Sequence, residues 1–173
     1  MSTQQRDYLD LQTKLDRVEK RSRQDRKTVF NNLGHLINLE MLGLCYQSLD
    51  GTKAVGIDGV TKEKYAENLE ENLKELLIKI RKGSYHPKAS RIVEIPKSDG
   101  GKRPLAIACL EDKIVQEAVK RILDRIFEPI FLDCSHGFRQ GRGCHTALID
   151  LNQNLMRRDC GAVFEIDLRK YFN

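Results

Sequence analysis

The sequence predicts an α+β fold in which helices predominate. Apolar residues recur at helical spacing through most of the chain before residue 158. A hairpin signal interrupts this pattern once, between residues 91 and 108. One further apolar run, residues 162–168, predicts a buried strand. A mixture of several helices and a few strands is typical of the α+β class.

The first helix is predicted over residues 5–27. Its apolar residues between Tyr8 and Val18 form a narrow stripe at helical spacing. Residues 20–27 are mostly cationic and too polar to enter a core. Such a helix either contacts RNA or is a solvated or partner-docking helix, and the stripe fits both interpretations.

Two more helices are expected before the hairpin. One covers residues 31–48, and the other begins after Thr61, which can cap it, and ends before Gly83. Residues 50–59 connect them as a loop rich in glycine and aspartate. This order places a helical region directly before the strands.

The hairpin carries three cations that could act together. Residues 91–96 and 103–108 are its predicted strands, joined by a tight turn with the sequence SDGG. Arg91, Lys97 and Arg103 are spaced six residues apart and can converge from both arms. Convergent cations can clamp a triphosphate, Arg through paired hydrogen bonds and Lys as a compact charge. The alternative is an exposed hairpin with ordinary edge-strand cations.

The chain after the hairpin is again mainly helical. An amphipathic helix runs from Ile114 to Ile126 and stops at Pro129. The loop HGFRQGRG, residues 136–143, then leads into a helix over residues 145–157. Glycines let this loop approach a ligand closely, although no GK[ST] ends it as in a Walker A loop.

Side chains that could bind a ligand or a metal ion occur in this loop and in the last predicted strand. Phe138 either offers a stacking face to a ligand or lies in the core, and we favour the core; we expect Arg139 and Arg142 to be functional. Asp167 lies in the apolar run, where an ionised carboxylate is costly unless it is paired or metal-bound. Glu165 would share its strand face, but one carboxylate alone cannot build a two-metal site. Local sequence alone therefore favours a structural role for Asp167.

Composition and charge restrict the classes of function. Hydrophobic residues make up 40% of the chain, enough for a core, and no run reaches membrane-spanning length or forms a signal peptide. The five cysteines form no CxxC pair, which predicts reduced thiols in a cytosolic protein. The isoelectric point is about 9.0, and residues 79–103 carry eight Lys and Arg against two acids. This segment suits a polyanion or a nucleoside triphosphate, or is a solvated cationic surface.

Four segments in order resemble the group II intron reverse transcriptases, namely RIVEIPKSDGGKRPLAI, LEDKIVQEAV, EPIFLDCSHGFRQGRGCHTAL and VFEIDLRKYFN. Upstream, GTKAVGIDGVTKEKY is similar to the N-terminal extension of the family, so the resemblance covers residues 31–173. It implies a basic N-terminal helix over 1–30 and an extension with helical fingers over 31–88. Fingers with the hairpin and helices would follow over 89–160, and the first strand of a right-hand polymerase palm over 161–173.

The resemblance assigns roles to residues of the palm. Asp167 matches the first catalytic, metal-binding aspartate, and the carbonyl of Leu168 would be a second metal ligand. Phe172 matches the aromatic gate that rejects a ribose 2′-hydroxyl. Many relatives have Asp at the position of Asn173, which is not a metal ligand. The YxDD segment of the family is absent from this sequence, so this segment alone is expected not to polymerise.

The fingers and the N-terminal helix receive binding roles from the same resemblance. Arg91 would stack near the base of the incoming nucleotide, and Lys97 and Arg103 would contact its triphosphate. The cations expected to bind template or intron RNA are Arg17, Lys20, Arg21, Arg23, Arg26, Lys27, Arg139 and Arg142.

The implied function is that of an RNA-directed DNA polymerase of a group II intron. Such a nucleotidyltransferase would use two Mg²⁺ ions, deoxynucleoside triphosphates, an RNA template and a DNA primer. It would also be a maturase that binds intron RNA for splicing and retrohoming. We expect it in the bacterial or organellar cytoplasm and expect no membrane as a partner. A homodimer is an open alternative. The alternatives are a retron or diversity-generating reverse transcriptase, an RNA-binding splicing cofactor that needs no polymerase activity, and a generic helical nucleic-acid-binding domain.

Overall fold

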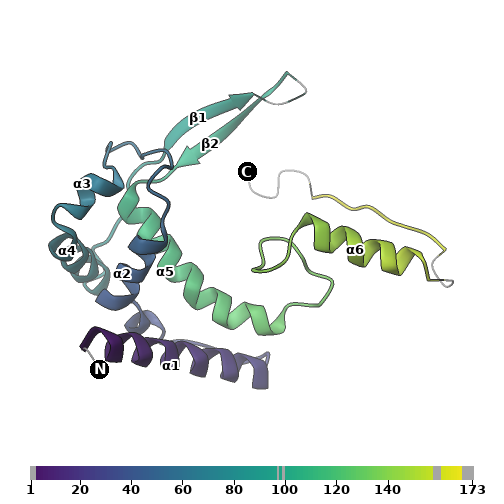
Figure 1. Ribbon diagram of the computed structural model, residues 1–173, viewed down its shortest axis with the longest axis horizontal. Coiled ribbons are helices and arrows are strands. Elements are labelled where there is room, and N and C mark those ends of the chain that lie inside the picture. The colour runs from purple at the N-terminus through teal and green to yellow at the C-terminus, as the bar shows by residue number, and fades with distance from the viewer. Residues whose placement is uncertain (1–2, 97, 99, 158–160, 169–173) are drawn as a thin grey trace. The chain divides into compact units, whose positions relative to one another are not determined.

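The structure is a computed structural model that describes residues 3–96, 98, 100–157 and 161–168. It divides into two compact units, residues 1–130 and residues 131–173. Several helices and one two-stranded antiparallel sheet confirm the predicted α+β class. The first unit contains α1 (Thr3–Gln24), η1 (Gly34–Leu36), α2 (Leu39–Ser48), α3 (Lys62–Ala66), α4 (Leu69–Arg81), β1 (Arg91–Pro96), β2 (Lys102–Ile107), α5 (Leu110–Phe127) and η2 (Glu128–Ile130). The second unit contains α6 (Cys144–Leu155) (Figure 1).

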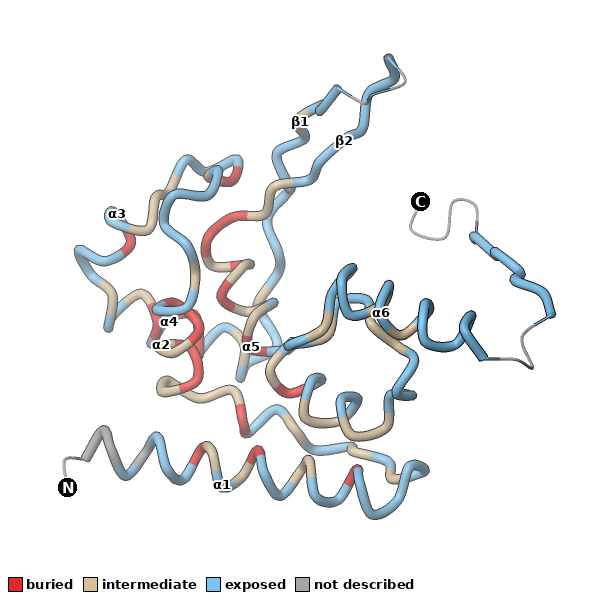
Figure 2. Tube along the Cα trace, turned by 45° about the vertical axis from the view of Figure 1, so that its right-hand side comes forward, coloured by how far each residue is buried: buried red, intermediate tan, exposed pale blue. Residues whose placement is uncertain are grey.

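Helix α5 is the centre of the first unit. Helices α1 and α2 pack against α5, and α4 packs against α2. Most buried positions in Figure 2 lie along these helices. Full burial of a Leu or Ile side chain contributes about 1.5–3 kcal/mol, so this cluster holds the unit together. Its most buried members are Leu11, Leu15, Leu36, Met41, Leu42, Cys45, Leu73, Leu76, Ile114, Ala118 and Ile122.

Helix α1 docks on α5 through the narrow apolar stripe that the sequence predicts. Leu11 and Leu15 are buried in the core. Ser22 is also buried, and its Oγ donates to a main-chain carbonyl oxygen of α5 at 2.5 Å. Arg125 of α5 pairs with Glu19 of α1 at 2.6 Å. The stripe therefore serves docking within the chain.

The helix boundaries follow capping side chains. Asn38 Oδ1 accepts a hydrogen bond from the N–H of Met41 at 2.8 Å, so α2 begins later than the predicted range of 31–48. Thr61 caps α3 as predicted. The single helix predicted after Thr61 is instead two, because Asn68 takes φ −132° and ψ 42° between α3 and α4. Asparagine has a low helix propensity, which is consistent with an interruption at this position.

The predicted hairpin is confirmed. Strands β1 and β2 pair antiparallel, with Arg91 opposite Ile107 and Pro96 opposite Lys102. The hairpin projects from the helices of the first unit in Figure 1. Most of its residues are exposed on both faces, so no other described element of the first unit covers either face.

The second unit is less regular than the sequence predicts. Helix α6 forms close to the predicted range of 145–157. The buried strand predicted over 162–168 is wrong, because these residues are exposed and have no regular secondary structure. A strand needs a hydrogen-bonded neighbour, and no second strand occurs among the described residues of this unit. In the part of the chain that the structure describes, no helix is long and apolar enough to cross a membrane.

Candidate nucleotide and RNA interface

One face of the β1–β2 hairpin carries two arginines. Side chains alternate between the faces of a strand, and directly opposed residues share a face. Arg91 lies opposite Ile107, and Arg103 lies opposite Ile95. Arg91 and Arg103 therefore share a face. They are separated by four residues along the ribbon, a distance of roughly 14 Å.

The strip beside and between these arginines is apolar and open to solvent. Val93 and Leu105 form the cross-strand pair between them, Ile95 lies opposite Arg103, and Ile95 and Leu105 are 43% and 45% exposed. An exposed apolar strip with a cation at each end suits a ligand that combines a flat apolar part with anionic groups. We call this face, formed by residues 91, 93, 95, 103, 105 and 107, the arginine face.

On the opposite face of the hairpin, the positive charge is compensated by a negative one. Glu94 Oε2 pairs with Lys102 Nζ at 2.7 Å. On the arginine face, Arg103 has no hydrogen-bond or ion-pair partner among the described residues. Positive charge without a counter-charge is thus a property of the arginine face. Lys97 lies outside the described residues, so its part in a clamp stays a prediction.

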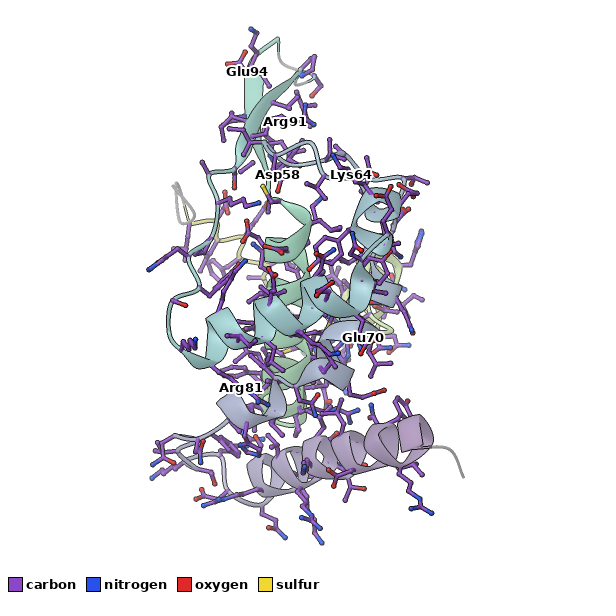
Figure 3. The ribbon with its side chains drawn as sticks, turned by 90° about the vertical axis from the view of Figure 1, so that its left-hand side faces the viewer. Asp58, Lys64, Glu70, Arg81, Arg91 and Glu94 are labelled. Atoms are coloured by element: carbon purple, nitrogen blue, oxygen red, sulfur yellow. The ribbon has the colours of Figure 1, made fainter. Side chains whose placement is uncertain are left out.

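The loop of residues 50–59 contacts the base of the hairpin. Arg91 Nε donates to the carbonyl oxygen of Val55 at 3.1 Å. Asp58 Oδ2 accepts from Lys88 Nζ at 2.9 Å, just before β1 begins. Figure 3 shows Arg91 and Asp58 at the foot of the hairpin. The orientation of Arg91 therefore depends on a loop more than thirty residues away in sequence.

A buried carboxylate anchors the segment that leads into β1. Asp112 of α5 is 3% exposed, and it accepts hydrogen bonds from the Tyr85 hydroxyl and from the N–H of Lys88 at 3.1 Å. Burial, followed by the hydrogen bond to Asp112, raises the pKa of Tyr85 above its usual value. The phenol thus stays protonated and remains a donor. The hairpin consequently starts from a fixed point on α5.

The six predicted RNA-contacting cations of α1 and the turn after it are all exposed. Arg23 pairs with Glu19 at 3.0 Å, and the guanidinium carbon of Arg21 lies 6.0 Å from the ring centre of Phe30. Contact with RNA stays a prediction, but the geometry leaves this surface open. The cations without a side-chain partner among the described residues are Arg17, Lys20, Arg26 and Lys27.

The arginines of the loop 136–143 hold the backbone of the segment directly before it, residues 132–135. Arg139 Nη1 donates to two main-chain carbonyl oxygens, at 2.9 and 2.8 Å. Arg142 Nη1 donates to the carbonyl oxygens of Asp133 and Ser135. The predicted RNA contact of these arginines stays a prediction, and the contacts described here are structural.

Phe138 lies in solvent, and the prediction that it enters the core is wrong. Its side chain is fully exposed, and its φ of 57° places it in the left-handed region. The physical reason lies in its neighbours. Arg139 and Arg142 turn toward the carbonyl oxygens of residues 132–135, and the turn that they stabilise presents Phe138 outward. Apolar character alone could not reveal this direction.

The predicted palm residues form no complete metal site in the structure. Asp167 and Leu168 are exposed in an irregular segment, and Glu165 is exposed as well. In residues 3–168, gaps excepted, no group of three or more His, Cys, Asp or Glu side chains could hold a metal ion. One carboxylate and one carbonyl oxygen suit Mg²⁺ chemically but do not suffice for it. Phe172 lies outside the described residues.

Sequence reasoning missed the contribution of the loop 50–59. The spacing of its residues predicts only a turn-rich connection. The available signal was Gly56, since a glycine can mark a close approach of two backbones. In the structure, a Cβ at Gly56 would lie 2.6 Å from the Cα of Cys109.

The chain is similar to several proteins connected with introns. It is 38% identical over 136 residues to the group II intron-encoded protein LtrA of Lactococcus lactis subsp. cremoris, which covers 78% of this chain and 23% of that protein. It is 31% identical over 163 residues to an uncharacterized 91 kDa protein in a cob intron of Schizosaccharomyces pombe, covering 92% and 20%. It is 38% identical over 71 residues to nuclear intron maturase 4, mitochondrial, of Arabidopsis thaliana, covering 41% and 9%. No protein-family model matches the chain.

An exposed arginine face and a cationic helix form the kind of basic surface that is typical of the nucleic-acid-binding class of proteins. The chain belongs to the family of group II intron-encoded reverse transcriptases and maturases. It spans less than a quarter of the length of each of these three relatives.

Proposed function

We propose that this chain supplies the fingers and the first part of the palm of an RNA-directed DNA polymerase encoded by a group II intron. The observation that carries this proposal is the arginine face, where Arg91 and Arg103 flank an exposed apolar strip. The intron-encoded relatives support the same assignment. Since the chain spans only part of their length, the activity is proposed for the full-length protein.

The incoming deoxynucleoside triphosphate would lie along the arginine face. Arg103, which has no partner among the described residues, would bind the triphosphate through paired hydrogen bonds and stabilise the charge that develops there. Arg91 would lie against the base, and Lys97 would add a compact charge. Phe172 would lie against the sugar and exclude nucleotides that carry a 2′-hydroxyl group.

Asp167 and the Leu168 carbonyl would contribute oxygen ligands for Mg²⁺, which prefers such hard donors. A two-metal site needs a further carboxylate that bridges the ions, and this would come from the rest of the full-length protein. When bound, Mg²⁺ would activate the primer hydroxyl and neutralise the leaving pyrophosphate. The irregular, exposed segment 161–168 would have to take on the geometry of a palm strand in that context.

The exposed cations of α1 and its following turn would bind the phosphates of template or intron RNA. Lys and Arg side chains without partners release counterions from RNA when they bind it, which drives association. This surface supports a maturase role alongside synthesis.

The test is primer extension by the full-length protein with a charge-neutral Arg103→Gln variant. Loss of a charge-assisted contact should raise the KM for deoxynucleotides roughly tenfold or more. Asp167→Ala should abolish extension. The matched control is Lys102→Gln, which removes a charge from the adjacent position of β2 but on the opposite face. Equal KM increases in Arg103→Gln and Lys102→Gln, or a fully active Asp167→Ala enzyme, would contradict the proposal.

A second candidate function is splicing without any need for synthesis. The similarity to a protein named intron maturase favours it. Asp167→Ala separates the two functions in a splicing assay, since splicing should persist while extension is lost. Loss of both together would argue that the two functions are not separable at this residue.

A further inference from the structure

We propose that the loop of residues 50–59 is a positioning element for Arg91, and thereby for the nucleotide. This inference rests on the proposed function, because it assumes that Arg91 contacts the incoming nucleotide. Arginine has five N–H donors, and the hydrogen bond from Nε to the Val55 carbonyl uses one of them. The four donors on the terminal nitrogens are left for a ligand, since no other partner of Arg91 occurs in the described chain.

The Val55 carbonyl group is held in place because α5 and its N-cap residue Cys109 contact the residues on both sides of it. Lys113 of α5 donates from Nζ to the carbonyl oxygen of Ala54 at 2.7 Å. At Gly56 the backbone lies so close to Cys109 that a Cβ would meet its Cα at 2.6 Å and its N at 2.7 Å. The loop is therefore fixed directly before and directly after the residue that binds Arg91.

A further contact joins the loop to the entry of β1. Asp58 accepts from Lys88 Nζ at 2.9 Å and from the N–H of Val60 at 3.2 Å. The same Lys88 donates its backbone N–H to the buried Asp112. The loop and the start of the hairpin are thus attached to the same end of α5. A shift of the loop would move the acceptor of Arg91 away from the hairpin.

Positioning matters here because the hairpin is exposed. An arginine on an uncovered ribbon would sample many rotamers, and binding would have to order it. A hydrogen bond that already restricts the side chain lowers this ordering cost. The expected effect is on the KM for deoxynucleotides, with little change of kcat.

The test uses primer extension by the full-length protein with Lys113→Met, which removes the contact to Ala54. The KM should rise roughly three- to tenfold, the range expected for one hydrogen bond, while kcat stays close to that of the parent. Lys120→Met is the matched control on the same helix, because Lys120 pairs only with Asp124 in the described structure. Its KM should be unchanged. Gly56→Ala should give a larger KM increase than Lys113→Met, because its Cβ would push the loop away from Cys109.

A double-mutant cycle shows whether the loop acts through Arg91. In an Arg91→Ala background, Lys113→Met should cause no further rise in KM, because its target is gone. If the KM increases of Arg91→Ala and Lys113→Met instead multiply fully in the double variant, the loop does not act through Arg91. That result would overturn the positioning role and leave nucleotide binding by Arg91 intact. An unchanged KM in Arg91→Ala alone would instead overturn the nucleotide role of Arg91 and the inference with it.

A direct readout comes from the Nε–H resonance of Arg91 in nitrogen-labelled protein. Its exchange with water should be slow in the parent chain and faster in Lys113→Met, but not in Lys120→Met. Equal exchange in all three proteins would contradict the inference independently of any activity.

Discussion

At the scale of the residue, Phe138 has an unfavourable backbone conformation. It is the one residue other than glycine with positive φ in the described chain, at 57°, and its side chain gains no burial. A left-handed conformation costs an L residue roughly 1–2 kcal/mol, whereas glycine adopts it freely but loses more entropy on folding. We expect Phe138→Gly to stabilise the loop and α6 by roughly 0.5–1 kcal/mol. Hydrogen exchange of the α6 amides should slow accordingly.

The matched control for this prediction is Phe164→Gly. Phe164 is also exposed, at 87%, but its φ is not positive. The control removes an exposed aromatic ring without relieving strain, so exchange in α6 should not slow. Faster exchange in Phe138→Gly than in the parent would show that the ring makes a stabilising contact.

The residue scale is also where the sequence predicts least about the site. Phe138 has the reverse of the expected direction, and Arg139 and Arg142 bind main-chain carbonyl oxygens that the sequence did not predict as their partners. Composition indicates which side chains could bind RNA, but the direction of a loop side chain depends on hydrogen bonds with carbonyl groups several residues away. Arg91 is the contrasting case. Its place on the hairpin could be predicted, but its contact with Val55 could not, because a separation of 36 residues leaves no periodic signal.

At the scale of the element, the pair formed by Asp58 and Lys88 makes the loop 50–59 sensitive to acid. Burial alone would raise the pKa of Asp58, but hydrogen bonds from Lys88 and from the N–H of Val60 outweigh it and lower the pKa. The folded pKa therefore lies below the unfolded value of about 4. The stabilisation is present above the unfolded value and is lost as pH falls through the lower, folded value. Urea unfolding between pH 6 and pH 2.5 should show this loss.

The variant Asp58→Asn should lack this part of the acid dependence, and its unfolding free energy should fall less between the two pH values. Glu67→Gln is the control, because Glu67 is exposed on the same unit and has no ion-pair partner among the described residues. It should follow the parent curve. Parallel curves for Asp58→Asn and the parent would mean that the pair does not stabilise the folded loop.

Helices and strands could be predicted from the sequence better than the directions of single side chains. The hairpin, the Thr61 cap and the docking stripe of α1 follow from short-range patterns, since side-chain alternation and capping are local. The strand predicted over 162–168 failed for a non-local reason. An apolar run forms a strand only when a neighbouring strand pairs with it through hydrogen bonds. The sequence of the run does not show whether such a partner strand is present.

At the scale of the whole molecule, the two cationic surfaces to which we assign ligands, α1 and the arginine face, lie at separate places in the first unit. Helix α1 and the hairpin are at opposite ends of this unit in Figures 1 and 3. RNA affinity and nucleotide affinity should therefore respond to different substitutions. We expect the triple change of Arg17, Lys20 and Arg26 to Gln to weaken RNA binding and to leave the KM for deoxynucleotides unchanged. Each lost contact with single-stranded RNA should lower the salt slope of binding by about 0.7, giving a total change of about 2.

The control for this last prediction keeps the same change in net charge at another place. Lys64, Lys74 and Lys120 are exposed and lie outside α1, the hairpin and the basic segment 79–103, and their combined change to Gln also removes three positive charges. If RNA binding depends on the local surface of α1, only the α1 variant should lose slope, as measured by titrations at several salt concentrations. Equal loss in both variants would mean that RNA responds to the net charge of the protein. A higher KM in the α1 variant would show that the two ends of the unit do not act separately.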